Sequence, residues 1–158
     1  YYKLILSSNF YKKRSVNENF FFLFNKIGLE ESLSGNFYTI NFFGWGGMNF
    51  KGFDYRGIGP FDGNLYLGGN KYFTTTIGYG GSFLFDAKDN INVKAFVTTG
   101  SIWDSDYSND DAFDIRTSVG FSLDVMSIIP ISISYAVPID KKSSDKTRNF
   151  NFNIGTSF

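Results

Sequence analysis

The stretch that decides the fold is Phe113 to Val125, with the sequence FDIRTSVGFSLDV. Alternate positions, beginning at Phe113, carry Phe, Ile, Thr, Val, Phe, Leu and Val, and the positions between them carry Asp, Arg, Ser, Gly, Ser and Asp. A helix would scatter these residues around its axis, whereas a β-strand sorts them onto two faces. Because residues 129–139 and 150–158 repeat the alternation, three successive strands are predicted near the C-terminus.

Three features indicate that the apolar faces of these strands contact lipid. The strands reach about nine to thirteen residues, which suits a tilted membrane crossing, whereas soluble strands usually have about five or six. Their polar faces carry mostly Ser, Gly and Asn, which are small enough for a crowded barrel interior. The aromatic residues Trp103, Tyr135 and Phe158 lie near strand ends, where interfacial girdles form. We therefore predict an all-β, antiparallel transmembrane β-barrel, with a soluble β-sandwich as the alternative.

The preceding part of the chain is less regular but is also predicted to be mainly strand. Strands are expected over residues 1–13, 19–30, 65–85 and 91–103, and loops over residues 104–111 and 140–149. Together with the three C-terminal strands this makes about seven. Residues 34–64 lack any strand periodicity and are rich in Gly and aromatic residues. Such a long loop is normally functional or disordered, and this one is too aromatic for disorder.

Composition excludes several classes of function. The 158 residues contain 15 Lys and Arg and 15 Asp and Glu, so no surface for nucleic acid is indicated. Because His and Cys are absent, the commonest general base and zinc ligand are missing, as is thiolate chemistry. The acidic segment 104–111 lacks the spacing of a calcium-binding EF-hand, and Gly44–Gly47 lacks the following Lys-Ser/Thr of a phosphate loop. We expect no enzymatic activity, no metal and no cofactor.

An ordered series of short motifs runs along the chain. They are Phe50-Lys51-Gly52-Phe53, Ile58-Gly59-Pro60, Leu67-Gly68-Gly69-Asn70, Ile115-Arg116-x-Ser118-x-Gly120, Ser134-Tyr135-Ala136-x-Pro138 and Phe152-x-Ile154-Gly155-x-x-Phe158. Each motif alone is weak, but the series is specific and resembles the Omp85 superfamily, the surface antigen D15 type of barrel. The resemblance covers essentially the whole chain. It implies the last seven strands of a sixteen-stranded barrel, with residues 34–64 folded inward and a last strand over residues 149–158.

The resemblance also implies a latch for the inward loop. In the family, an Arg at the position of Lys51 points into the barrel and pairs with acidic residues of two neighbouring strands. This sequence departs at all three points, because the expected Asp is Thr98 and the expected Glu is Gly78. A Lys also lacks the bidentate fork of Arg. We expect Asp114 or Asp124 to act as the substitute partner of Lys51, and the alternative is that Lys51 is a solvated loop cation.

The resemblance implies the assembly and insertion of β-barrel proteins into an outer membrane, as the core barrel of a BamA- or Sam50-like complex. Alternatives are a polypeptide-secreting transporter of the two-partner type, and a structural or adhesive barrel without insertase activity. The last strand would form one side of an opening seam, where a substrate strand pairs by β-augmentation. Phe152, Ile154, Gly155 and Phe158 would carry the seam and the C-terminal assembly signal.

The expected partners follow from the same resemblance. They are outer-membrane lipid, unfolded β-barrel substrates, accessory subunits, and the N-terminal strands and POTRA domains of the same protein. About seven strands cannot close the barrel of this family, and an open edge in lipid leaves amide groups unpaired. We therefore expect the chain to be the C-terminal half of a larger protein or to pair with another chain; the lack of a signal peptide at Tyr1 also suits a processed or excised piece. The terminal Phe favours a bacterial outer membrane, with a mitochondrial one as the alternative.

Overall fold

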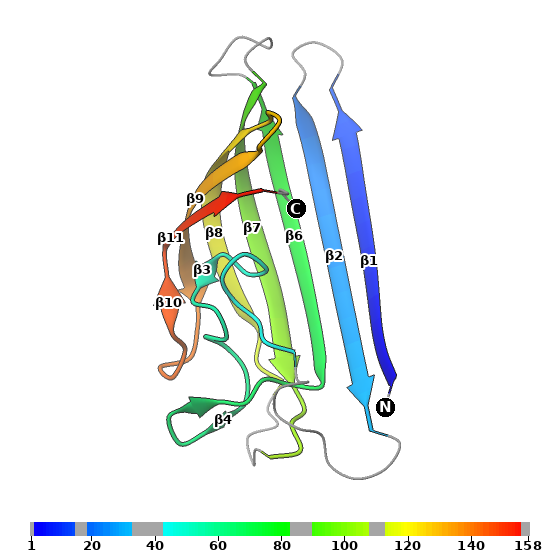
Figure 1. Ribbon diagram of the computed structural model, residues 1–158, viewed down its shortest axis with the longest axis vertical. Coiled ribbons are helices and arrows are strands. Elements are labelled where there is room, and N and C mark those ends of the chain that lie inside the picture. Colours follow the sequence, from blue (N-terminus) through cyan, green and yellow to red (C-terminus); the bar gives the residue numbers. More distant parts are fainter. Residues whose placement is uncertain (1, 15–18, 33–42, 83–89, 108–112, 156–158) are drawn as a thin grey trace.

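Seven long strands form one antiparallel sheet in the computed structural model, which describes residues 2–14, 19–32, 43–82, 90–107 and 113–155 (Figure 1). In their order across the sheet, these strands are β1 (Tyr2–Lys13), β2 (Phe20–Glu31), β6 (Lys71–Gly81), β7 (Ile91–Trp103), β8 (Arg116–Val125), β9 (Ile131–Asp140) and β11 (Phe150–Ile154). Four two-residue strands lie outside the sheet, namely β3 (Gly52–Phe53), β4 (Phe61–Asp62), β5 (Leu65–Tyr66) and β10 (Thr147–Arg148). The order in space follows the order in the chain, as in a meander.

Strand pairing is long at one side of the sheet and short at the other. Strand β1 pairs with β2 from Tyr2 opposite Glu31 to Lys13 opposite Phe20, whereas β11 pairs with β9 only from Phe150 to Ile154. The predicted last strand, 149–158, therefore ends earlier than expected among the described residues, and residues 156–158 lie outside them. The strand predicted to begin at residue 65 begins at Lys71, because residues 65–66 pair with 61–62 in a separate hairpin.

The two faces of the sheet differ as the alternation predicts. On the outer face large apolar side chains are bare: Phe121 is 58% exposed, Phe152 54% and Ile139 65%. On the inner face of β8 and β9 the intervening side chains are mostly small and covered, and Ser118 and Ala136 are 0% exposed, whereas β1 is exposed along its whole length. Soluble monomers rarely expose so wide an apolar surface, whereas the strands of a membrane barrel carry apolar side chains on the face that contacts lipid. Within the described residues, no helix is long and apolar enough to cross a membrane.

Part of the inner face is covered by residues 43–70, here called the inward loop, which lies in front of the sheet on the side of β7 to β9 in Figure 1, whereas β1 stays exposed. Its apolar residues form a cluster with one side chain each from β6 and β7. The members are Phe43, Trp45, Phe50, Phe53, Ile58, Tyr72 and Ile102. Burying an aromatic side chain contributes on the order of 2 kcal/mol relative to leaving it exposed. The cluster therefore gives the loop a packed core of its own, in agreement with its aromatic composition.

Candidate functional site: the inward loop and the inner cavity

The Phe50-Lys51-Gly52-Phe53 motif is the most deeply buried part of the inward loop. Phe50 and Phe53 are both 0% exposed, and their rings pack edge to face with centroids 5.0 Å apart. Between them Gly52 has φ +99°, and a Cβ there would lie 3.0 Å from Cβ of Ser118 and 3.5 Å from Cδ of Pro138. Only glycine combines this backbone conformation with so close an approach. The motif is therefore docked directly on β8 and β9.

The next motif, Ile58-Gly59-Pro60, continues the docking toward β7. Ile58 is 1% exposed, and Gly59 approaches β7 so closely that a Cβ would lie 3.0 Å from Cγ2 of Ile102. The carbonyl of Pro60 accepts a hydrogen bond from the N–H of Leu67 at 3.1 Å, which closes the β4–β5 hairpin. All seven residues of the two motifs thus belong to the packed part of the loop, although Lys51 is only partly covered.

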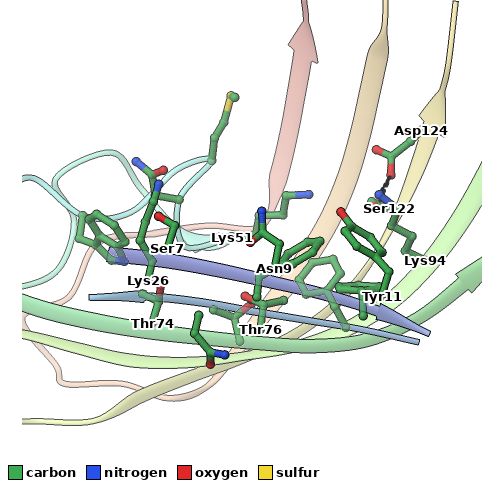
Figure 2. Close-up of a pocket in the computed structure, with 18 residues that line it drawn as sticks. Ser7, Asn9, Tyr11, Lys26, Lys51, Thr74, Thr76, Lys94, Ser122 and Asp124 are labelled. Atoms are coloured by element: carbon green, nitrogen blue, oxygen red, sulfur yellow. Dashed lines mark hydrogen bonds and ion pairs between the residues drawn. The ribbon is translucent and has the colours of Figure 1, made fainter. Parts of the chain in front are cut away.

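Lys51 points its ammonium group into a cavity between the loop and the sheet (Figure 2). The Nζ atom lies 5.2 Å from the centroid of the Phe96 ring, a cation–π distance. Burial lowers the pKa of Lys51, the charge of Asp124 opposes this shift, and the charge of Lys94 adds to it. Among the residues that the structure describes, no carboxylate lies within 4.0 Å of this ammonium.

The two carboxylates that were predicted as partners of Lys51 each form an ion pair with another lysine. Asp124 lines the same cavity as Lys51, and its Oδ2 is 2.8 Å from Nζ of Lys94. Its Oδ1 accepts a hydrogen bond from the hydroxyl of Ser132. Asp114 forms an ion pair with Lys142. In this geometry Asp124 forms no direct ion pair with Lys51. Its negative charge attracts the ammonium at longer range and so opposes the lowering of the pKa of Lys51.

The two positions at which the family's acids are replaced have specific surroundings. Thr98 exchanges a hydrogen bond with Thr76 on the neighbouring strand, with 2.9 Å between the hydroxyl oxygens. At Gly78 a Cβ would lie 2.2 Å from Cζ of Phe22, so the Phe22 ring already occupies the space that a Glu side chain would need. Aromatic rings therefore stand where an ion pair would be expected, and Lys51 lies against one of them, Phe96.

The cavity has a volume of about 470 Å³ and is walled by β1, β2, β6, β7, β8 and the inward loop. The side chains that line it include three lysines, Lys26, Lys51 and Lys94, against one acid, Asp124. The difference, three minus one, gives the described lining a formal charge of +2. The polar side chains between them, such as Asn9 and Thr74, are neutral, so the cavity favours anionic groups.

A second charged group, which the sequence-based interpretation missed, lies at the start of β8. Arg116 donates to Asp145 through Nε at 3.1 Å and through Nη2 at 3.0 Å, and its Nη1 donates to the carbonyl of Asp114 at 3.0 Å. The side chains are 2% and 0% exposed. The sequence feature that could have indicated this group is an Arg on the small-residue face of a strand, because a buried charge requires a partner. Sequence alone does not identify that partner, which is 29 positions away.

The last strand changes its backbone conformation at Gly155. Gly155 has φ +119°, and its N–H donates to the carbonyl of Pro130 at 2.9 Å, so regular pairing stops at Ile154. Phe152 and Ile154 point outward and are more than half exposed. Within the described residues, β11 has one paired edge and its other edge is open. Phe158 lies outside the described residues.

The sequence model of the family described as "Omp85 superfamily domain" matches residues 2–158 of this chain. The chain belongs to the Omp85 superfamily. It is 24% identical over 194 residues to the outer membrane protein assembly factor BamA of Neisseria meningitidis serogroup B, a match that covers 94% of this chain and 24% of that protein. The crystal structure of BamA from Haemophilus ducreyi lacking POTRA domains 1–3 is similar with a TM-score of 0.81, at 21% identity.

The family and the fold predicted from the motifs are thereby confirmed. The seven-stranded sheet matches part of a BamA barrel, and the match covers 95% of this chain but 34% of the Haemophilus ducreyi chain. The chain thus spans about a quarter of the curated relative and a third of the solved structure. Members of this family are outer-membrane proteins rather than enzymes, in agreement with the function class expected from composition.

Lys51 gives the first testable prediction. Replacing it in this Omp85 protein by Lys51→Met removes a charge whose desolvation is only partly offset by a ring contact, so we expect a change in unfolding free energy of about 1 kcal/mol or less. Because the folded protein binds this proton less readily than the unfolded chain, the natural protein should gain stability as pH rises from the lowered pKa of Lys51 to its ordinary value.

The measurement is urea unfolding of the full-length protein at several alkaline pH values. The Lys51→Met variant should lose part of the rise in stability with pH. A loss of several kcal/mol at neutral pH would instead show that the ammonium is held by a strong ion pair.

Proposed function

We propose that the protein containing this chain folds and inserts β-barrel proteins into an outer membrane, as the core barrel of a BamA-like complex. The observation that carries the proposal is the combination, in a member of this family, of a docked inward loop with a last strand that pairs with β9 over five residue pairs among the described residues. A rigid inner support beside a weakly paired edge is what a strand-accepting seam requires. The relatives named above are bacterial, which supports a bacterial outer membrane as the location.

The edge of β11 that faces away from β9 would supply the chemistry of acceptance. In a membrane the backbone N–H and C=O groups of that edge need a partner strand, because hydrocarbon cannot satisfy them. An incoming substrate strand satisfies them by main-chain hydrogen bonds, which need no particular substrate sequence. Because β11 holds β9 over only five residue pairs, the strand can shift at a smaller cost than β1 or β2 could.

Cross-linking of a substrate strand tests the proposal. In the full-length protein with cysteines elsewhere replaced, Asn151→Cys on β11 should form a disulfide with a cysteine in the last strand of an unfolded small barrel substrate. Ser134→Cys is the matched control, because it lies opposite Asn151 on β9, whose two edges are already paired. We expect at least a tenfold excess of cross-link for Asn151→Cys, together with substrate folding in liposomes.

The outcomes separate the alternatives. Equal cross-linking at both positions, or none in a protein that still folds, would contradict acceptance at this edge. A cross-linked polypeptide that is released across the membrane without folding would identify a secretion transporter instead.

A further inference from the structure

The segment between β9 and β11 is held at its centre by one buried side-chain pair. Asp145 receives both hydrogen bonds of the Arg116 fork, at 3.0 and 3.1 Å, and its Oδ2 also accepts from the N–H of Lys142 at 2.8 Å. The N–H of Asp145 in turn donates to the carbonyl of Lys142 at 3.2 Å. The carboxylate therefore fixes the turn 142–145 internally and anchors it to the first residue of β8.

The same segment contacts the inward loop along its length. Residues 52–53 pair with residues 147–148, and the N–H of Asp54 donates to the carbonyl of Lys146 at 2.9 Å. The N–H of Lys146 donates to the carbonyl of Gly57 at 2.9 Å. Farther along, the hydroxyl of Tyr66 donates to the carbonyl of Ser144 at 2.7 Å. The loop thus binds segment 141–148 mainly through its backbone, on both sides of Asp145.

Lys51 makes no contact of comparable strength between the inward loop and the sheet. Its ammonium contacts the Phe96 ring at 5.2 Å, and no carboxylate lies within ion-pair distance among the described residues. Burial lowers its pKa, which means that the site disfavours the charge. By contrast, Arg116 and Asp145 are almost fully buried and their geometry is the bidentate one that is strongest for this pair.

We propose that Arg116 and Asp145 are the positioning residues that hold the inward loop in place, acting through segment 141–148. Arg116 fixes Asp145, Asp145 fixes the turn, and the turn presents the backbone groups to which residues 52–57 and Tyr66 bind. Since segment 141–148 leads directly into β11, the loop and the last strand are tied to the same anchor. The inference concerns the position of the loop and holds whether or not the protein inserts barrels.

A disulfide reporter measures whether the loop is docked. The chain has no cysteine, so Asp54→Cys and Lys146→Cys can be introduced into the full-length protein after replacement of any cysteines outside it. These neighbours are joined by the 2.9 Å backbone hydrogen bond. The two substitutions remove the exposed pair of Asp54 with Arg148, the hydrogen bond from the N–H of Tyr55 to Asp54, and the contact of Lys146 with the Tyr66 ring, and they do so equally in every variant compared. A second reporter, Ile77→Cys with Val97→Cys, joins opposed outer-face residues of β6 and β7, away from the loop.

The expected result is a selective slowing of the loop reporter. In membranes under mild oxidation, Arg116→Gln and Asp145→Asn should slow the Asp54–Lys146 disulfide at least fivefold and leave the Ile77–Val97 disulfide within twofold of the unsubstituted protein. Arg116→Lys keeps the charge and should recover much of the rate. Lys51→Met, the matched control, should leave the loop reporter within twofold.

The contrary results are equally specific. If Arg116→Gln leaves the loop disulfide at its original rate, or if Lys51→Met slows it as much, the proposal is overturned. If both reporters slow together, or if neither the Arg116→Gln nor the Asp145→Asn protein shows the gel mobility of a folded barrel, the pair serves the whole sheet and the proposal also fails.

Discussion

Gly52→Val is expected to destabilise the protein by about 3 kcal/mol and to expel the inward loop from the inner face. A β-branched residue at φ +99° costs about 1–3 kcal/mol in backbone strain. The added side chain would also overlap Ser118 and Pro138, because even its Cβ would lie at 3.0 and 3.5 Å, and overpacking costs about 1–3 kcal/mol. The measurement is urea unfolding of the full-length protein, combined with the loop disulfide described above.

The control for this prediction is Gly63→Ala, which shares one of the two causes. Gly63 has φ +58°, but no heavy atom lies within 4 Å of a Cβ built there. Gly63→Ala should therefore lower the free energy of unfolding by only about 1 kcal/mol, which is the cost of a left-handed backbone conformation in an open turn. If the two substitutions proved equally costly, the close approach of Gly52 to β8 and β9 would not be the reason for its glycine.

Asp145→Ala should be the most damaging substitution of a charged residue in the described part of the chain. It leaves the Arg116 guanidinium buried with a single carbonyl acceptor, that of Asp114, and it deprives the N–H of Lys142 of its acceptor. Removing one partner of a buried pair typically costs about 3–5 kcal/mol. Urea unfolding of the full-length protein measures the loss, with the exposed Arg148→Ala as a control that should cost about 0–1 kcal/mol.

The double variant Arg116→Met with Asp145→Leu separates stability from loop position. Replacing both charges by apolar side chains of similar size removes the unpaired guanidinium, so stability should return to within about 2 kcal/mol of the natural protein. The turn 142–145 would still lack the acceptor that organises it, so docking of the loop should stay impaired. Full recovery of both properties would show that packing alone positions the segment.

The strands and their faces could be predicted because their cause is local. In Phe113–Val125 each side chain goes to one face or the other by the pleat of its own backbone, and no distant residue is needed to decide this. The same holds for the bare outer positions, such as Phe121, and the covered inner ones, such as Ser118. The loop motif was also visible, because it stands in an ordered series of motifs that resembles the Omp85 superfamily.

The contacts of the charged residues could not be predicted in this way. Arg116 and Asp145 are 29 positions apart, and their meeting depends on how the segment after β9 turns back across the sheet. The start of β6 at Lys71 was not predicted, because residues 65–66 form backbone pairs with residues 61–62 and not with the neighbouring strands of the sheet. The Phe22 ring occupies the space beside Gly78 and belongs to the same cluster as Phe96, over which Lys51 lies, and this arrangement also depends on contacts between separate strands.

The sequence by itself therefore determined an outer-membrane type of sheet, its two faces, the family and the loop that fills its interior. The sheet and its faces follow from period-two alternation, and the family and the inward loop follow from the resemblance of the ordered motifs to the Omp85 superfamily. Only the tertiary structure decided which charges meet, because a buried guanidinium accepts whichever carboxylate the folded backbone brings within about 3 Å. In this protein that carboxylate is Asp145, on the segment that also binds the inward loop and leads into the last strand.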